Sequence, residues 1–181
     1  DQVPGAPTSV GSPGTSEFAT VAFEPACPPP SGTGGIDLAT YGIVGRHPLP
    51  THFDTPGTPA GSELATEVSA ITYNWDTDTL FVVGDEGTSV VQVSKTGQLI
   101  DSMTLAAGEF ADTEGLAYLG GGQFVLAEER LRQAVRFTYE GGGVLEDSET
   151  EAVKLATTIG NIGLEGISYD PLSSDASGPG F

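Results

Sequence analysis

Residues 114–118 read Glu-Gly-Leu-Ala-Tyr, and close variants of this short motif occur twice more in the chain. Residues 69–73 read Ser-Ala-Ile-Thr-Tyr, and residues 165–169 read Glu-Gly-Ile-Ser-Tyr. The three closing tyrosines are 45 and 51 residues apart. Repetition at a period of roughly 40–50 residues is typical of β-propellers, in which each repeat forms one blade.

Each of the first two motifs is followed by three more short apolar segments, which Gly, Asn, Asp and Thr residues separate. These segments are 80–86, 89–93 and 98–105 in the first unit, and 123–129, 133–139 and 153–158 in the second. Four short strands per unit are the pattern of an antiparallel propeller blade. No segment favours a long helix. We therefore expect an all-β fold, a β-propeller of four-stranded antiparallel blades.

The length of the repeating region predicts an incomplete ring. Residues 46–181 provide enough chain for about three blades, whereas closed propellers have typically four to eight. The remaining blades, or another chain, are needed to close the ring. A half ring would leave open sheet edges, which invite association.

The N-terminal region has a different composition. Residues 1–35 contain seven prolines among many Gly, Ser and Thr residues, which predicts a linker. Within it, residues 18–23 (Phe-Ala-Thr-Val-Ala-Phe) have the composition of a short strand that docks on a neighbour. Residues 37–46 are expected to form a first strand of the folded part. We therefore divide the chain into a linker, 1–35, and the N-terminal part of a propeller domain, 36–181.

The charge balance excludes two classes of partner. The 181 residues include 25 Asp and Glu but only 6 Lys and Arg, for a formal net charge of −19. A nucleic-acid-binding protein needs a basic surface to displace counterions from phosphates, so we expect no nucleic-acid partner. No run of 18 apolar residues is present, so we expect no membrane insertion.

Six acidic residues recur at corresponding places in the repeats. Glu114 and Glu165 begin first strands, whereas Asp85-Glu86 and Glu128-Glu129 end second strands. Because neighbouring strands of a blade are antiparallel, these positions are expected to meet at one rim of the central channel. Close carboxylates repel one another unless a cation neutralises them. A hard cation with oxygen ligands, Ca²⁺ before Mg²⁺, would serve as the cofactor.

A structural role for the same carboxylates is the alternative. A carboxylate at a strand end can accept hydrogen bonds from backbone N–H groups or pair with an arginine, and Arg130, Arg132 and Arg136 follow Glu128-Glu129 closely. Asn74, Asp76 and Asp78 imitate the start of an EF-hand loop, but Thr79 replaces the required glycine. We interpret that segment as a β-turn.

The repeats resemble the SdiA-regulated domain family, which comprises bacterial six-bladed propellers of extracytoplasmic proteins. The resemblance rests on residues 67–74, 81–87, 112–118, 128–130 and 163–171. It implies an extracellular or periplasmic binding module of a larger exported protein. This chain departs from the family pattern in two ways: the later blades are absent, and Ser69 stands where the next repeats have Glu.

The family is also similar to esterase-like phytase domains. That similarity implies an alternative function, a metal-dependent phosphoester hydrolase in which the acidic rim holds metal ions that bind a substrate phosphate. Arg130 and Arg132 are the cations nearest to this rim in the sequence. A structural spacer, in which the rim carboxylates have no role in binding, is a third interpretation.

Overall fold

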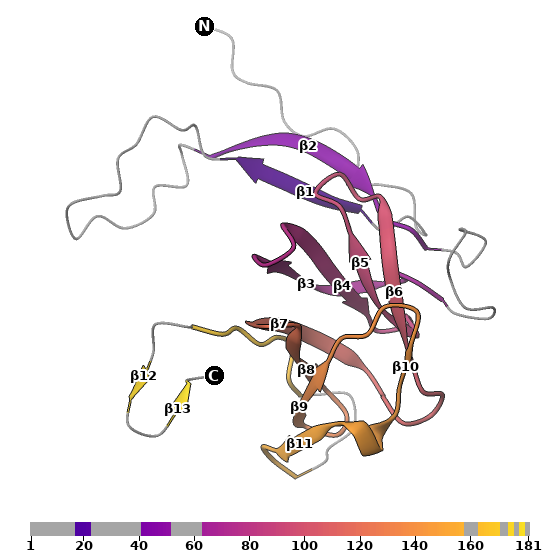
Figure 1. The fold of residues 1–181 in the computed structure, drawn as a ribbon, viewed down its shortest axis with the longest axis vertical. Coiled ribbons are helices and arrows are strands. Elements are labelled where there is room, and N and C mark those ends of the chain that lie inside the picture. The colour runs from indigo at the N-terminus through magenta and orange to yellow at the C-terminus, as the bar shows by residue number, and fades with distance from the viewer. Residues whose placement is uncertain are drawn as a thin grey trace, which may run out of the picture.

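The computed structural model describes residues 17–22, 41–51, 63–157, 163–170, 174–175 and 178–179. Within these ranges every regular element is a strand except one 3₁₀ turn, η2 (Asp147–Glu149) (Figure 1). The strands are β1 (Glu17–Ala22), β2 (Gly42–Pro48), β3 (Val68–Asn74), β4 (Thr79–Gly84), β5 (Ser89–Val93), β6 (Leu99–Leu105), β7 (Thr113–Gly120), β8 (Gln123–Glu128), β9 (Gln133–Thr138), β10 (Val144–Leu145), β11 (Glu151–Lys154), β12 (Ser174–Asp175) and β13 (Gly178–Pro179). The all-β expectation is confirmed.

Two sheets correspond to the first two repeats. Strands β3 to β6 pair in sequence order and antiparallel, and β10 adds to the edge of β6 in parallel. Strands β7, β8, β9 and β11 form the second antiparallel sheet. We call the β3–β6 sheet blade 1 and the β7–β11 sheet blade 2. They follow one another in Figure 1 without closing into a ring, as in an incomplete propeller.

The charged segment before β11 is more ordered than the loop expected there. Residues 147–149 form η2, and the side chains of Glu146 and Glu149 make reciprocal capping hydrogen bonds with the backbone. The fourth strand of blade 2 therefore begins at Glu151 and ends at Lys154, earlier than the expected 153–158. It pairs with β9, where Glu151 lies opposite Arg136.

The third repeat forms no strand in its described part, residues 163–170. This segment nevertheless lies directly beside β7. A methyl group at Gly115 would come within 2.9 Å of the backbone nitrogen of Ile167. The third repeat thus continues past the open face of blade 2, and Gly115 allows its close approach.

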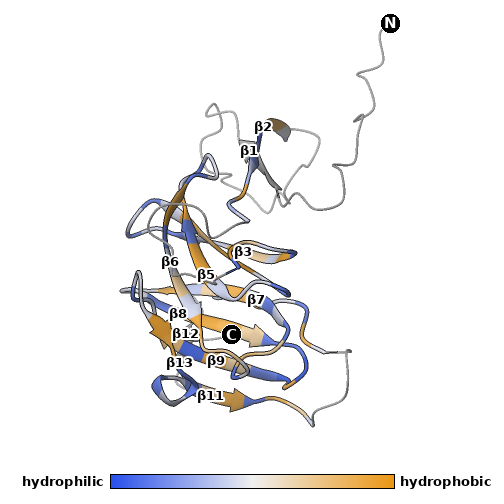
Figure 2. Ribbon diagram, turned by 90° about the vertical axis from the view of Figure 1, so that its right-hand side faces the viewer, coloured by the Kyte–Doolittle hydropathy of each residue, from blue (hydrophilic) through white to orange (hydrophobic). Residues whose placement is uncertain are grey.

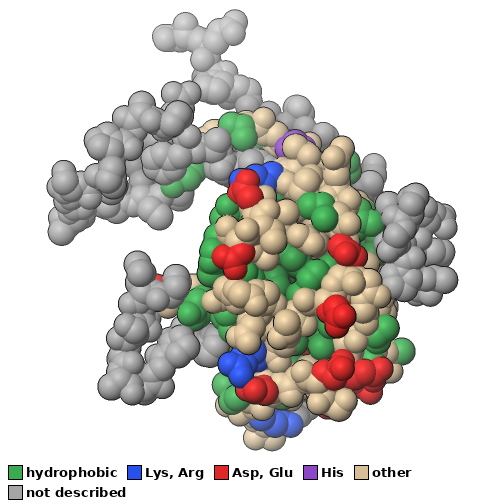
Figure 3. Space-filling view, viewed as in Figure 1, with side chains coloured by type: hydrophobic (Ala, Val, Ile, Leu, Met, Phe, Trp, Pro, Cys, Tyr) green, Lys and Arg blue, Asp and Glu red, His purple; other side chains and the backbone are tan. Residues whose placement is uncertain are grey.

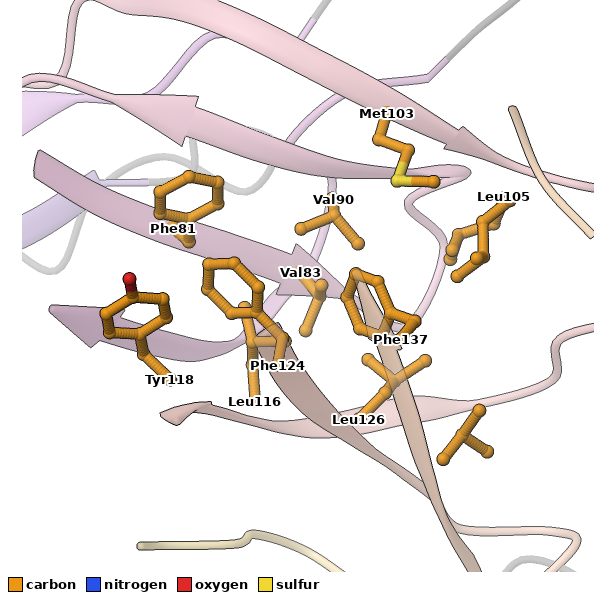
Figure 4. Packing of buried hydrophobic residues seen from close by; sticks show 12 residues of the cluster. Phe81, Val83, Val90, Met103, Leu105, Leu116, Tyr118, Phe124, Leu126 and Phe137 are labelled. Carbon is orange, nitrogen blue, oxygen red and sulfur yellow. The ribbon is translucent and has the colours of Figure 1, made fainter. Parts of the chain in front are cut away.

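Alternating apolar side chains build a core between the two blades. Phe81 and Val83 of β4 project from blade 1 toward Phe124 and Leu126 of β8 (Figure 4). The ring centroids of Phe81 and Phe124 are 4.6 Å apart. We call this cluster the inter-blade core; its buried members are Phe81, Val83, Val90, Met103, Leu105, Leu116, Tyr118, Phe124, Leu126, Val135, Phe137 and Leu145. Burial of each such large side chain stabilises the fold by about 1.5–3 kcal/mol.

The opposite face of blade 1 carries a smaller cluster, the rear core. Val82, Val91 and Val93 of blade 1 pack there against chain segments that precede β3. Those segments supply Leu49, Leu64 and Ala65. The strands carry most of the apolar residues, whereas the turns between them are hydrophilic (Figure 2). Because blade 1 carries an apolar cluster on each face, β4 is buried continuously from Phe81 to Gly84.

The N-terminal strand β1 pairs antiparallel with β2 in a separate two-stranded sheet. The expected strand at 18–23 is therefore present at Glu17–Ala22, and the one expected at 37–46 is β2. The rest of the 1–35 segment lies outside the described residues, so the linker and its boundary stay a prediction. No helix in the described part is long and apolar enough to cross a membrane.

Tight turns join the paired strands where the sequence places turn residues. Gly120, at the end of β7, has positive φ, as do Gly121 and Gly122 between β7 and β8. In the first unit, the side-chain oxygen of Asn74 accepts hydrogen bonds from the backbone nitrogens of Asp76, at 2.9 Å, and Thr77, at 3.1 Å. The EF-hand-like segment is thus a β-turn, as expected.

Candidate functional site

The junction between blades 1 and 2 brings the end of β4 to the start of β7. The Thr113 hydroxyl donates a hydrogen bond to the carbonyl oxygen of Gly84 at 2.9 Å, and this contact is buried. Gly84 has no room for a side chain, because a methyl group there would lie 2.0 Å from the carbonyl oxygen of Thr66. The residues that flank this contact, Asp85 on one side and Asp112 and Glu114 on the other, are thereby held together.

Asp85, Asp112 and Glu114 form a cluster of carboxylates, which we call the junction cluster. One oxygen from each of the three side chains lies within 4.8 Å of the other two. Asp112 is buried, Glu114 is half-buried and Asp85 is exposed, so the cluster opens to solvent on the Asp85 side. Oxygen donors at this separation suit a hard cation such as Ca²⁺.

The electrostatics of the cluster reflect its like charges. A side-chain hydrogen bond with Asp112, together with desolvation and the charges of Asp112 and Glu114, raises the pKa of Asp85 to about 6. The positive charge of Arg130, whose Nε donates to Oδ2 of Asp112, acts to lower the pKa of Asp85. The Arg130 side chain is mostly exposed, whereas that of Asp112 is buried. The protein thus compensates part of the negative charge internally.

A small cavity of about 70 Å³ adjoins the junction cluster. Asp85, Asp112 and Thr113 are among the residues that line it. The other lining residues are Gly87, Thr88, Leu105, Ala106, Ala107, Gly108 and Phe110. A water molecule takes up about 30 Å³ in the liquid, so this space suffices for an ion with a water ligand. The cavity therefore allows ligands beyond the three carboxylates.

The structure distributes the six acidic residues singled out from the sequence over different environments. Asp85 and Glu114 lie in the junction cluster. Glu86 and Glu165 are exposed and are not members of it. Their role as metal ligands stays a prediction, as it does for all six residues.

Glu128 and Glu129 are buried instead. Glu128 is 0% exposed, and its carboxylate accepts hydrogen bonds from the Ala111 backbone nitrogen at 3.0 Å and Gln133 Nε2 at 2.5 Å. Burial raises the pKa of Glu128. The Glu129 backbone nitrogen donates to the carbonyl oxygen of Asp112 at 2.9 Å. Glu128 thus makes the backbone-capping contact that the structural alternative describes.

Asp112 is the member of the junction cluster that the sequence reasoning did not single out. That reasoning considered only acids at strand ends, whereas Asp112 precedes β7. Asp112 lies just before the strand and has a positive φ of 52°, so the alternation of an extended strand gives no signal for its side chain. Glu67, at the corresponding place before β3, shares the positive φ of Asp112, 45° against 52°.

Among the residues that the structure describes, no equivalent carboxylate cluster occurs at the next junction along the chain. Gly163 follows Asp112 by the same 51 residues that separate Tyr118 and Tyr169. Glu129 has the structural place of Asp85, because its backbone nitrogen donates to Asp112 as that of Asp85 does to Glu67. A methyl group at Gly163 would lie 2.5 Å from the carbonyl oxygen of Glu129. The close packing leaves no space for an acidic side chain at this position.

One protein family matches the part of the chain that contains both blades. Residues 54–175 match the model of the family described as SdiA-regulated. The match includes β3 to β11, both blades and the junction cluster. It covers more than half of the chain, and it confirms the resemblance found in the repeat motifs. The chain therefore belongs to the SdiA-regulated family.

Proposed function

We propose that this chain is a binding module of a larger exported protein and that its junction cluster binds a Ca²⁺ ion. The observation that supports the proposal is the approach of Asp85, Asp112 and Glu114 to within 4.8 Å of one another. Bringing three carboxylates together is costly in the absence of a cation, and the raised pKa of Asp85 reflects that cost. The buried Gly84–Thr113 contact holds the two sides in place before any ion arrives.

Calcium fits this geometry better than magnesium does. Ca²⁺ accepts six to eight oxygen ligands in irregular arrangements, whereas Mg²⁺ demands a near-octahedral set and gives up its water reluctantly. The cluster supplies three carboxylates from two chain segments and opens on one side to solvent and on another to the small cavity. An irregular shell completed by water is the expected result.

Calorimetric titration and thermal melting with CaCl₂ and MgCl₂ test the proposal. We expect heat of binding and a raised Tm with Ca²⁺, both abolished in Asp85→Asn and Glu114→Gln. Glu86→Gln is the matched control, because Glu86 adjoins Asp85 in sequence but lies outside the cluster. Absence of heat and of any Tm change in the unaltered chain would remove the calcium proposal.

One observation favours the second candidate function, a metal-dependent phosphoester hydrolase. The guanidinium of Arg130 contacts the cluster and is largely exposed, so it is placed to hold a phosphate beside a bound metal. Metal-dependent release of nitrophenol from nitrophenyl phosphate, lost in Arg130→Gln, would support this candidate. Complete inactivity with Ca²⁺, Mg²⁺ and Mn²⁺ would contradict the hydrolase candidate and favour the binding module.

Export to the periplasm or the cell exterior is also a proposal, supported by the family's resemblance to extracytoplasmic propellers. The net charge of −19 and the single cysteine are compatible with either compartment outside the cytoplasm. Fractionation of cells that express the natural gene, followed by immunodetection, tests it. Recovery in the cytoplasmic fraction alone would contradict export.

A further inference from the structure

Strand β10 belongs to the second repeat by sequence but pairs with blade 1. The chain leaves blade 2 after β9, forms β10 beside β6, and returns through η2 to β11, which pairs with β9 (Figure 1). A blade needs no such excursion, because a short hairpin loop is enough to join two antiparallel strands. We call residues 140–149 the strap. Both of its ends connect to blade 2, and its middle lies on the edge of blade 1.

Backbone hydrogen bonds attach the strap to the outer edge of β6. The backbone nitrogen of Gly142 donates to the carbonyl oxygen of Ser102 at 2.8 Å. In the other direction, the backbone nitrogen of Thr104 donates to the carbonyl oxygen of Gly143 at 2.9 Å. The edge strand of a sheet otherwise presents unpaired backbone groups to solvent. The strap therefore satisfies backbone groups of blade 1 with backbone groups from the repeat of blade 2.

Leu145 anchors the strap in the inter-blade core. Its side chain is 1% exposed, whereas that of Val144, its neighbour in β10, is 49% exposed. Adjacent residues of a strand project to opposite faces, so β10 turns one side chain inward and the next one outward. The carbonyl oxygen of Leu145 also accepts a hydrogen bond from the backbone nitrogen of Ala106 at 2.9 Å. The strap is thus packed as well as hydrogen bonded.

Further contacts hold the two ends of the strap against the chain of the first repeat. At the start, the backbone nitrogen of Glu140 donates to the sulfur of Met103 in β6 at 3.4 Å. At the other end, the backbone nitrogen of Asp147 donates to Oε2 of Glu109 at 2.6 Å. Glu109 lies in the connection between β6 and β7. The strap therefore follows blade 1 from its first residue to η2.

We propose that the strap is a conformational clamp that makes blades 1 and 2 unfold together as one cooperative unit. In a repeat protein, the strength of coupling between neighbouring units decides whether they open singly or together. The inter-blade core couples the blades through side chains alone. With the strap in place, blade 1 cannot separate from blade 2 unless β10 leaves β6 and Leu145 leaves the core. The proposal is independent of cation binding.

The clamp has a functional consequence for the folded chain. Proteases cleave segments that open transiently, and local opening of a single blade would expose such segments. Blades that open only together expose them as rarely as the whole chain unfolds. We therefore assign to the strap the protection of both blades against proteolysis.

A bypass variant tests this proposal. Replacement of residues 140–149 by the dipeptide Asn-Gly joins β9 to β11 through a short hairpin loop and keeps the four strands of blade 2. In the unaltered chain, the hydrogen-exchange protection factors of β4 and β8 should agree within about threefold. In the bypass variant they should differ by at least about tenfold, and thermolysin should cleave this variant at least about tenfold faster.

Two point variants within β10 provide a milder test if the bypass variant does not fold. Leu145→Ala should lower the Tm by at least about 5 °C and reduce the protection of β4 and β8 by the same factor. Val144→Ala is the matched control, because it truncates the exposed neighbour, and it should shift the Tm by no more than about 2 °C. Unequal protection of the two blades in the unaltered chain would overturn the proposal. Equal protection in the bypass variant, or a loss confined to one blade in Leu145→Ala, would overturn it as well.

Discussion

The hydroxyl of Tyr118 donates a hydrogen bond to the carboxylate of Asp76, and this contact joins the β3–β4 turn of blade 1 to β7 of blade 2. The same carboxylate accepts a hydrogen bond from the backbone nitrogen of Gly121 at 2.9 Å. Trp75 packs edge-on against the Tyr118 ring, with centroids 4.5 Å apart. The two blades are therefore joined by polar contacts at both ends, here and at Gly84–Thr113, with the apolar core between them.

Replacing Tyr118 by Phe should weaken the blade interface by about 1 kcal/mol, the usual net contribution of one hydrogen bond. The hydrogen bond from Tyr118 lowers the pKa of Asp76 below its ordinary value of 3.8. A carboxyl whose folded pKa is lowered contributes stability above pH 3.8, and this stability is lost as the pH falls through the folded pKa. Urea unfolding of the unaltered chain and Tyr118→Phe at pH 7 and pH 3 should thus show a smaller difference at pH 3.

Tyr73→Phe is the control for that measurement. Tyr73 also donates to an aspartate, Asp78 at 2.5 Å, but this contact is exposed and stays within one hairpin. We expect a smaller change in unfolding free energy than in Tyr118→Phe. If Tyr73→Phe loses as much unfolding free energy as Tyr118→Phe, the contact between the blades contributes no more than a contact within one hairpin.

Phe124→Ala should be among the most destabilising single changes, because Phe124 is fully buried in the inter-blade core. Its ring lies within 6.1 Å, centroid to centroid, of four other aromatic rings, those of Phe81, Tyr118, Phe137 and Tyr139. We expect a loss of about 3–5 kcal/mol in unfolding free energy. Phe124→Leu, a milder change, keeps the measurement possible if the alanine variant does not fold.

Val153→Ala is the matched control on the same sheet. Val153 of β11 is exposed and lines a groove of about 410 Å³ on the outer face of blade 2. Its truncation should change the unfolding free energy by less than about 0.5 kcal/mol. Similar losses in both variants would contradict a core located between the blades.

The pH dependence of stability should reveal the repulsion in the junction cluster. The pKa of Asp85 is raised from 3.8 to about 6, so the folded chain holds its proton more tightly than the unfolded chain does. This contribution to stability is complete below pH 3.8 and is lost as the pH rises through about 6. Asp85→Asn should therefore remove this loss. In the absence of calcium and at pH values above 6, its Tm should be higher than that of the unaltered chain. Saturating Ca²⁺ should reverse the order, with the unaltered chain melting higher than Asp85→Asn.

Melting curves from pH 4 to 8, with chelator or with CaCl₂, provide the measurement. Glu86→Gln serves again as the control and should follow the unaltered chain. If Asp85→Asn melts lower than the unaltered chain at pH 8 in chelator, then Asp85 stabilises the ion-free fold and the repulsion argument is wrong.

Glu128→Ala should separate the structural from the ligand-binding role of the acidic residues. The change removes a buried carboxylate and leaves the Ala111 N–H and the Gln133 amide without their acceptor, so we expect a loss of about 2–4 kcal/mol. Because Glu128 lies outside the junction cluster, the calorimetric heat per mole of folded chain should stay unchanged. A loss of calcium binding in a well-folded variant would assign Glu128 to the site instead.

The repeat motifs predicted the strands closely because their signal is local. The continuous apolar run of residues 80–83 defines β4, and Gly120–Gly122 define the turn before β8. The prediction for the end of the charged segment was less accurate, since η2 depends on the capping contacts of Glu146 and Glu149. The pairing of β10 with β6 was not predicted, because a contact between segments of different repeats leaves no periodic signal.

The candidate site was only partly visible in the sequence. The predicted rim correctly placed Asp85 and Glu114 together. It also included Glu128 as a ligand, although the side chain of Glu128 is buried in the protein. Strand ends are places where a bulge reverses side-chain direction, and both β3–β4 and β7–β8 have a register shift there. Acidic residues stay spread over the surface of both blades (Figure 3), so composition alone does not identify the cluster.

The order of residues by itself determined the all-β class, the four-stranded unit and the family, because hydrophobic alternation and turn residues act over a few positions. Tertiary structure alone decided which carboxylates meet. Asp85 and Asp112 are far apart in the chain, and the packing of the two blades, with the buried bond from Thr113 to Gly84, sets their separation. Distances between side chains depend on how two sheets pack, and that packing is a property of the whole core rather than of any local pattern.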